Sequence, residues 1–142
     1  MKLSKERTER YEQKIDKLKE RVKDTENWIQ DGINSLQKNT ERRLAIYKAF
    51  QEAVEAMADI CAMYLSDSDR VVRDDAENIE KSSGKLFSKE LQTSLIEANG
   101  LRNRLIHEYN GLENSIALES IDRLLESLEK FTEEVKEWIK NR

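Results

Sequence analysis

Apolar residues recur every three or four positions along most of this chain, and this spacing places them on one face of an α-helix. The first such stretch carries a narrow apolar stripe, made of Tyr11, Ile15, Leu18, Val22, Thr25 and Ile29. The segment DGINS at 31–35 interrupts the stripe with a glycine and an asparagine. The pattern therefore predicts an amphipathic first helix that stops before this segment.

A second helix is predicted from Leu36 to Leu65, with a much broader apolar face. That face comprises Leu44, Tyr47, Phe50, Val54, Met57, Ile60, Cys61 and Tyr64. A helix that is apolar over so wide an arc usually lies at the centre of a bundle. The segment SDSD at 66–69 ends this helix and offers N-caps to a short third helix near Val71 to Ser82.

Two further helices complete the pattern. SSGK at 82–85 interrupts the chain, and Ser88 is the expected N-cap of a fourth helix over residues 88–109. Asn114 is the expected cap of a long last helix. Its apolar residues alternate strictly by four and three: Ala117, Ile121, Leu124, Leu128, Phe131, Val135 and Trp138. This alternation is typical of a helix-packing seam that faces the core.

Composition supports an all-α fold. Proline is absent and glycine occurs only four times. The 142 residues are enough for one domain with one hydrophobic core. We therefore predict that residues 1–142 form a single all-α domain, an up-and-down bundle of four to five helices.

The charge balance narrows the possible functions. Charged residues make up 38% of the chain and the net charge is −4, so any binding to nucleic acid must be concentrated at one place. The single cysteine, Cys61, favours a reducing, cytoplasmic location, and no apolar run is long enough for a signal peptide or a membrane span. One histidine and one cysteine leave too few ligands for a zinc site, so we expect no metal and no cofactor.

The stretch GLRNRLIHEY at 100–109 contains the only histidine of the chain, His107, together with Arg102 and Arg104. On a helical wheel, Arg102 falls inside the arc of apolar residues that must face the core. A buried guanidinium is costly unless it is paired, so Arg102 needs a partner. Arg104 is expected to be a solvated charge.

Three polar side chains, Asn99, Asn103 and His107, form a row on the adjoining flank of this helix. Two interpretations are open at this point. In one, Arg102 pairs with a glutamate of the bundle and His107 is a half-exposed polar residue. In the other, Arg102 and His107 bind an anion between them. For Tyr109, a core aromatic with its hydroxyl at the surface is the default interpretation.

The longer string resembles the HepT toxin family of the HEPN superfamily. The family motif has an arginine, a polar residue, a histidine after three or more further positions, and a tyrosine two positions later, often preceded by Gly-Leu. The matching residues are Gly100, Leu101, Arg102, Asn103, His107 and Tyr109. The resemblance extends over about residues 8–140 through the helix order. Glu108 departs from the family, which often has a small residue there, and its carboxylate would repel phosphate.

The resemblance implies a HEPN-like bundle and a ribonuclease that cuts RNA without a metal ion. It implies Arg102 and His107 as catalytic residues, with Asn103 positioning the phosphate or His107. In the family two copies of the motif face one another in a homodimer. The resemblance also implies a cognate minimal nucleotidyltransferase as antitoxin, and addition of AMP to Tyr109. Phosphates added there would occupy the anion site and repel RNA.

Two other hypotheses belong to different functional classes. A non-catalytic helical adaptor would dimerise and bind a nucleotidyltransferase without cutting RNA. An unrelated bundle would use Arg102 and His107 only for its structure. The two alternatives make different predictions. The adaptor associates stably with the nucleotidyltransferase and has no nuclease activity, whereas in the unrelated bundle alanine substitutions of Arg102 and His107 lower stability and not activity.

Overall fold

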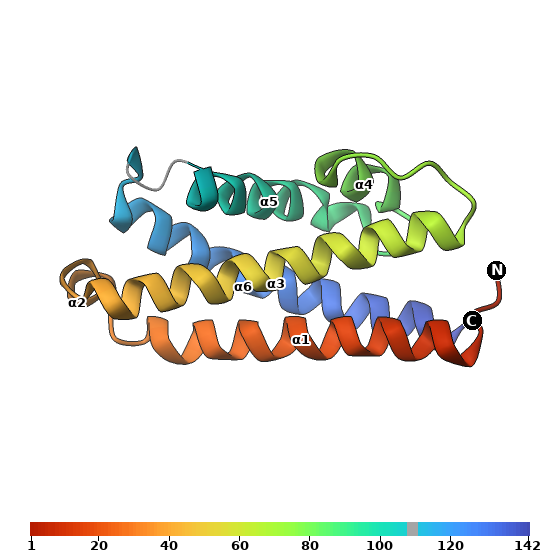
Figure 1. The fold of residues 1–142 in the computed structure, drawn as a ribbon, viewed down its shortest axis with the longest axis horizontal. Helices are drawn as coiled ribbons and strands as arrows, with labels where there is room; N and C mark the ends of the chain where they lie inside the picture. Colours follow the sequence, from red (N-terminus) through yellow and green to blue (C-terminus); the bar gives the residue numbers. More distant parts are fainter. Residues whose placement is uncertain (108–110) are drawn as a thin grey trace.

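The computed structural model describes residues 1–107 and 111–142. Across this part of the chain, α-helices are joined by short turns, and the only β-type pairing is an isolated bridge between Ser83 and Phe87. The helices form one elongated bundle with both chain termini at the same end (Figure 1). The predicted all-α bundle is confirmed.

Four longer helices make the body of the bundle: α1 (Lys5–Ile29), α3 (Thr40–Asp67), α5 (Gln92–His107) and α6 (Asn114–Lys140). The short elements are α2 (Ile33–Lys38), α4 (Asp75–Ser82) and the 3-10 turn η1 (Lys89–Leu91). Helices α1 and α3 lie side by side, and α6 packs against both (Figure 1). Helices α4 and α5 pack on α3 at the side away from α1, which places the motif-bearing helix on an outer face.

The predicted apolar stripes form the core. All seven seam residues of α6 are buried, and the stripe on α1 is buried from Tyr11 to Thr25. The wide apolar face of α3 is likewise buried except for Leu44, which is exposed. A helix that contacts α1, α4, α5 and α6 needs such a wide face, because each neighbour covers a different part of it.

The predicted continuous helix from Leu36 is wrong, because the chain breaks at Asn39. Asn39 has φ −110° and ψ 89°, which is not helical. Its Oδ1 accepts the backbone N–H of Arg42 at 3.0 Å, so Asn39 serves as the N-cap of α3. The segment before it forms the separate short helix α2, which buries Leu36.

The third helix begins later than predicted. Asp69 has a positive φ of 56°, which turns the chain away from α3. The segment that follows leaves Val71 and Val72 exposed, and α4 starts only at Asp75. Asp74, and not the 66–69 segment, caps this helix by accepting the backbone N–H of Glu77 at 2.9 Å.

The start of the motif-bearing helix also differs from the prediction. Ser88 precedes the 3-10 turn η1 without capping it through its side chain, and regular α5 begins at Gln92. Glu134 of α6 accepts the backbone N–H of Ser88 at 2.6 Å and so fixes this turn against the bundle. Asn114 is the first residue of α6 and supplies no cap, because Glu113 occupies the capping position.

Candidate functional site

Helix α5 carries the motif and ends at His107. Its buried residues Leu95, Ala98, Leu101 and Leu105 hold it against the bundle. Glu108 and Tyr109, the last two residues predicted for this helix, lie outside the described residues. The described part of the site consists of Asn99, Arg102, Asn103 and His107.

Arg102 lies mostly below the surface, with 19% of its side chain exposed. Its Nη1 is 3.6 Å from Oδ2 of Asp75 and donates to Oδ1 of Asn103 at 3.3 Å. Its Nε is buried without a hydrogen-bond partner in the described part of the chain. The prediction that Arg102 lies in the apolar arc and needs a partner is confirmed. The partner is an aspartate of α4 and not a glutamate.

The polar row on α5 runs from the core to the solvent. Asn99 is only 4% exposed, whereas Asn103 and His107, one and two turns later, are exposed. Asn103 is the residue that joins this row to Arg102, through its contact with Nη1. Arg104 is exposed, as predicted.

Arg102 and His107 do not share a face of α5. Five residues turn an α-helix through about 140° beyond one full turn and advance it by about 7.5 Å. Arg102 accordingly faces α4, where it meets Asp75, while His107 stands in solvent at the helix end. The structure brings Arg102 and Asn103 together but does not bring Arg102 and His107 onto one surface of the same protomer.

Exposed apolar side chains lie at the end of the bundle that carries His107. The first turns of α3 and α6 and the last turn of α5 meet at this end, opposite the two termini (Figure 1). The Tyr47 hydroxyl donates to Oδ1 of Asn114 at 2.6 Å and joins α3 to α6 there. We call this region the motif end; its exposed residues are Leu44, Ile106, His107 and Ile116. Ile106 and Ile116 are 42% and 57% exposed, which is unusual for isoleucine.

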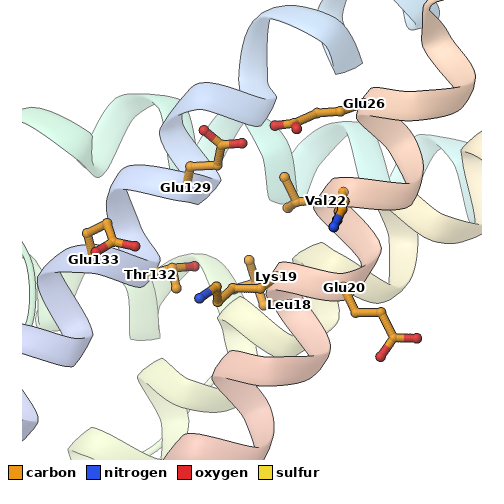
Figure 2. Close-up of a pocket in the computed structure, with 9 residues that line it drawn as sticks. Leu18, Lys19, Glu20, Val22, Glu26, Glu129, Thr132 and Glu133 are labelled. Atoms are coloured by element: carbon orange, nitrogen blue, oxygen red, sulfur yellow. The ribbon is translucent and has the colours of Figure 1, made fainter.

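A groove of about 590 Å³ lies elsewhere, between α1 and α6, and none of the predicted site residues lines it. Its floor includes Leu18 and Val22, and Figure 2 shows the carboxylates of Glu26 and Glu129 turned toward one another across it. The hydrogen bond to Glu26, together with some burial, raises the pKa of Glu129 to about 7. The groove therefore carries a carboxyl group, Glu129, whose pKa is raised by a neighbouring carboxylate.

Asp75 is the functional candidate that the sequence did not reveal. The helical wheel indicated that Arg102 needs a partner, but it gave no information on which residue of another helix would supply one. Asp75 stands in the first turn of a short helix, where an acidic residue is ordinarily explained by the helix dipole. Only the packing of α4 on α5 distinguishes it from the other acidic residues of the chain.

Two absences bear on the predictions above. Within residues 1–107 and 111–142, no three or more histidine, cysteine, aspartate or glutamate side chains are grouped so that they could hold a metal ion. No helix in the same part of the chain is both long and apolar enough to cross a membrane.

The chain is similar in sequence to a family of known ribonucleases. The sequence model of the family described as ribonuclease HepT-like matches residues 11–135. Two proteins of Archaeoglobus fulgidus, each described provisionally as an RNase, are similar to this chain. One is 29% identical over 136 residues, covering 92% of this chain and 94% of the relative. The other is 32% identical over 111 residues, covering 75% and 81%.

Solved structures share the fold. A tri-AMPylated HEPN toxin of Shewanella oneidensis, in complex with its MNT antitoxin, superposes with a TM-score of 0.81 at 21% identity, covering 89% of this chain and 96% of that one. A toxin–antitoxin crystal structure with AMP-PNP gives a TM-score of 0.80 at 20% identity, covering 88% and 96%. The resemblance found in the motif is thus confirmed over the whole fold. The chain belongs to the HepT-like ribonuclease family.

Proposed function

We propose that this protein is a HepT-like toxin, a metal-independent endoribonuclease that acts through a cleft formed by Arg102 and His107 of two protomers. The observation that carries the proposal is the arrangement on α5. Arg102 is held below the surface beside Asp75 and Asn103, whereas His107 is exposed at the end of the same helix. Membership of a ribonuclease family supports RNA as the substrate.

The side chains supply the chemistry that RNA cleavage needs. Histidine exchanges protons most readily near neutral pH, so His107 can take the proton of a ribose 2′-OH or return one to the leaving oxygen. The guanidinium of Arg102 can hold the scissile phosphate and stabilise the charge that its oxygens gain in the transition state. Asn103, already hydrogen-bonded to Arg102, is the residue suited to keep the phosphate or His107 in register.

A second copy of the chain completes the site. Arg102 and His107 lie about 140° apart around one helix, so a single phosphate is reached more easily by Arg102 of one protomer and His107 of the other. Ile106, next to His107 on α5, and Ile116, in the first turn of α6, are exposed and supply apolar surface that such a homodimer would bury. A cleft that collects basic groups from two protomers also explains how an acidic protein attracts RNA.

The proposed partner is a minimal nucleotidyltransferase that acts as antitoxin. The two solved structures described above are toxin–antitoxin assemblies by name, and one holds an AMPylated HEPN toxin. In this chain the acceptor of AMP would be Tyr109, two residues after His107 in the sequence. Added phosphates would occupy the anion site and block RNA.

Cleavage of labelled RNA in the presence of EDTA tests the catalytic part. His107→Ala and Arg102→Ala should each lose activity by roughly 10²-fold or more, the range found for removal of an acid–base or anion-binding group. Arg104→Ala is the matched control, since it removes an exposed arginine from the same helix, and it should cut like the wild type. Equal cleavage by all four proteins would overturn the proposal.

Mixing the two inactive proteins tests the shared cleft. A dimer with one Arg102→Ala protomer and one His107→Ala protomer retains one site in which the arginine and histidine come from different chains. Such mixed dimers should recover about half of wild-type activity if the site is composite. Absence of recovery, with dimers verified by light scattering, would place each site within one protomer.

Intact mass tests the switch. After incubation with ATP and a nucleotidyltransferase encoded next to this chain, the protein should gain mass in AMP-sized steps, and Tyr109→Phe should not. A stable complex with no mass gain and no RNA cleavage by the free protein would instead favour the non-catalytic adaptor.

A further inference from the structure

We propose that Asp75 is a positioning residue for Arg102, a carboxylate on a neighbouring helix that holds the guanidinium in place before RNA arrives. The catalytic meaning of this contact rests on the proposed function, whereas the contact itself is a property of the free protein. Asp75 belongs to α4 and lies outside the motif, 27 residues before Arg102 in the chain.

The contacts of Arg102 divide its guanidinium into three parts. Its Nε is buried and has no hydrogen-bond partner among the described residues. Its Nη1 is shared between Asp75 at 3.6 Å and Asn103 at 3.3 Å. Its Nη2 makes no hydrogen bond to another residue in the described part of the chain.

Asp75 stands on a locally rigid support. Asp74 caps α4 through the backbone N–H of Glu77, and Asn78, which is buried, bonds both the N–H and the carbonyl of Arg73 at 2.8 and 3.0 Å. Ile79 anchors the same helix in the core. Because α4 is fixed in these ways, the carboxylate of Asp75 is a fixed reference point for the arginine on α5.

The ion pair is suited to orientation more than to stability. At 3.6 Å, Nη1 and Oδ2 are farther apart than in a good hydrogen bond, and 43% of the Asp75 side chain is exposed. Exposed pairs of this kind contribute little to folding. A free arginine has many rotamers, however, and a guanidinium that is already oriented binds and stabilises a phosphate without that loss of freedom.

The same carboxylate opposes binding of the phosphate by its charge. Removing Asp75 should therefore lower kcat, because orientation is lost, without raising KM, because repulsion of RNA is relieved. A residue with a purely structural role would change neither constant for the folded protein. This separation distinguishes positioning from stability.

Steady-state cleavage of RNA by the dimeric protein provides the first test. Asp75→Ala should lower kcat by about tenfold, as expected for a slightly misplaced catalytic group, without raising KM. Asp75→Asn keeps an acceptor oxygen and should recover part of kcat. Glu80→Ala is the matched control: it removes an exposed carboxylate from the same helix but neither the cap of α4 nor a contact to Arg102, so kcat of the folded protein should stay at the wild-type value. An unchanged kcat in Asp75→Ala would overturn the proposal.

NMR of the free protein provides a test that does not depend on RNase activity. The buried Nε–H of Arg102 should give a side-chain cross-peak that is absent in Arg102→Lys. In Asp75→Ala this peak should shift and exchange faster with water, whereas Glu80→Ala should leave it in place. If the wild type cut no RNA, the proposed function would fail, and the NMR comparison would still decide whether Asp75 holds Arg102. If the Arg102 cross-peak in Asp75→Ala had the same position and the same exchange rate as in the wild type, the positioning role would be overturned.

Discussion

At the end of the bundle where both termini lie, the charged and aromatic side chains satisfy one another, whereas at the motif end several are exposed or unpaired. Asp67 accepts the hydroxyl of Tyr11 at 2.7 Å and pairs with Arg7 at 3.0 Å. The ring of Tyr11 lies 5.5 Å from that of Trp138, and Tyr64 packs on the same indole at 5.4 Å. Burial and the neighbouring carboxylate hold the pKa of Tyr11 well above its usual range, so the phenol stays a donor.

Several side chains of α5 and of the motif end lack such partners. Ile106 and Ile116 are exposed, His107 stands in solvent, and Nε of Arg102 and Oδ1 of Asn99 are buried without partners in the described part of the chain. The polar side chains of α5 are therefore held by fewer partners than Tyr11, Asp67 and Arg7 are. This difference favours a structural role for the Tyr11–Asp67–Arg7 network and a binding role for the polar groups of α5.

The largest expected effect is the loss of RNA cleavage when His107, at the motif end, is replaced. His107→Ala should lower RNA cleavage by roughly 10²- to 10⁴-fold while leaving the free energy of unfolding within about 0.5 kcal/mol of the wild type, because His107 is exposed. Thermal denaturation alongside the cleavage assay measures both. A large fall in stability would show that His107 has a structural role, which the comparison denies.

The opposite effect, a loss of stability without a loss of activity, is expected for the contacts of Asp67 with Tyr11 and Arg7. Asp67→Ala should lower the free energy of unfolding by about 2–3 kcal/mol, because the buried hydroxyl of Tyr11 and the guanidinium of Arg7 lose their acceptor. RNA cleavage by the folded fraction should stay unchanged. Urea denaturation gives the value, and Asp59→Ala, which breaks an exposed pair with Lys14, should cost less than about 1 kcal/mol.

A charge placed on the apolar surface of the motif end should break the dimer. Ile116→Glu is expected to raise the dimer dissociation constant by at least roughly tenfold, about 1.4 kcal/mol, without destabilising the protomer. Analytical ultracentrifugation measures the constant. Val71→Glu introduces the same charge at an equally exposed residue away from the motif end, and weakening of the dimer by that control would argue against a specific surface.

The smallest effect concerns pH. The pKa of Glu129 is raised in the folded state, so its contribution to stability is present at acid pH and is lost as pH rises from about 4.5 through about 7. Glu129→Gln removes this loss and should make the protein slightly more stable than the wild type at pH 8, with no advantage at pH 4. Glu129 is exposed, so screening keeps the gain below about 1 kcal/mol. Urea midpoints at the two pH values measure the gain, and an equal gain at both would argue against a raised pKa of Glu129.

The sequence predicted the features that depend on neighbouring residues in the chain, and it missed those that depend on contacts between helices. The α6 seam could be placed because apolar periodicity over many turns is independent of neighbouring helices. The break at Asn39 could not, since asparagine fits both a helix interior and an N-cap, and the choice depends on burying Leu36 through α2. Arg102 was predicted to need a partner, but Asp75 depended on the docking of α4, which no periodicity encodes. The catalytic roles of Arg102, Asn103 and His107 remain predictions for the cleavage assays.

Both chain termini emerge at the end of the bundle remote from the motif (Figure 1). Helix α6 has 27 residues and is therefore about 40 Å long, so a label or surface tether on either terminus stands about that far from His107. A dimer joined at its motif ends would carry its two pairs of termini on opposite outer poles, about 80 Å apart. A single-chain version would need an extended linker of about 25 residues, whereas tagged protomers would keep the cleft unobstructed.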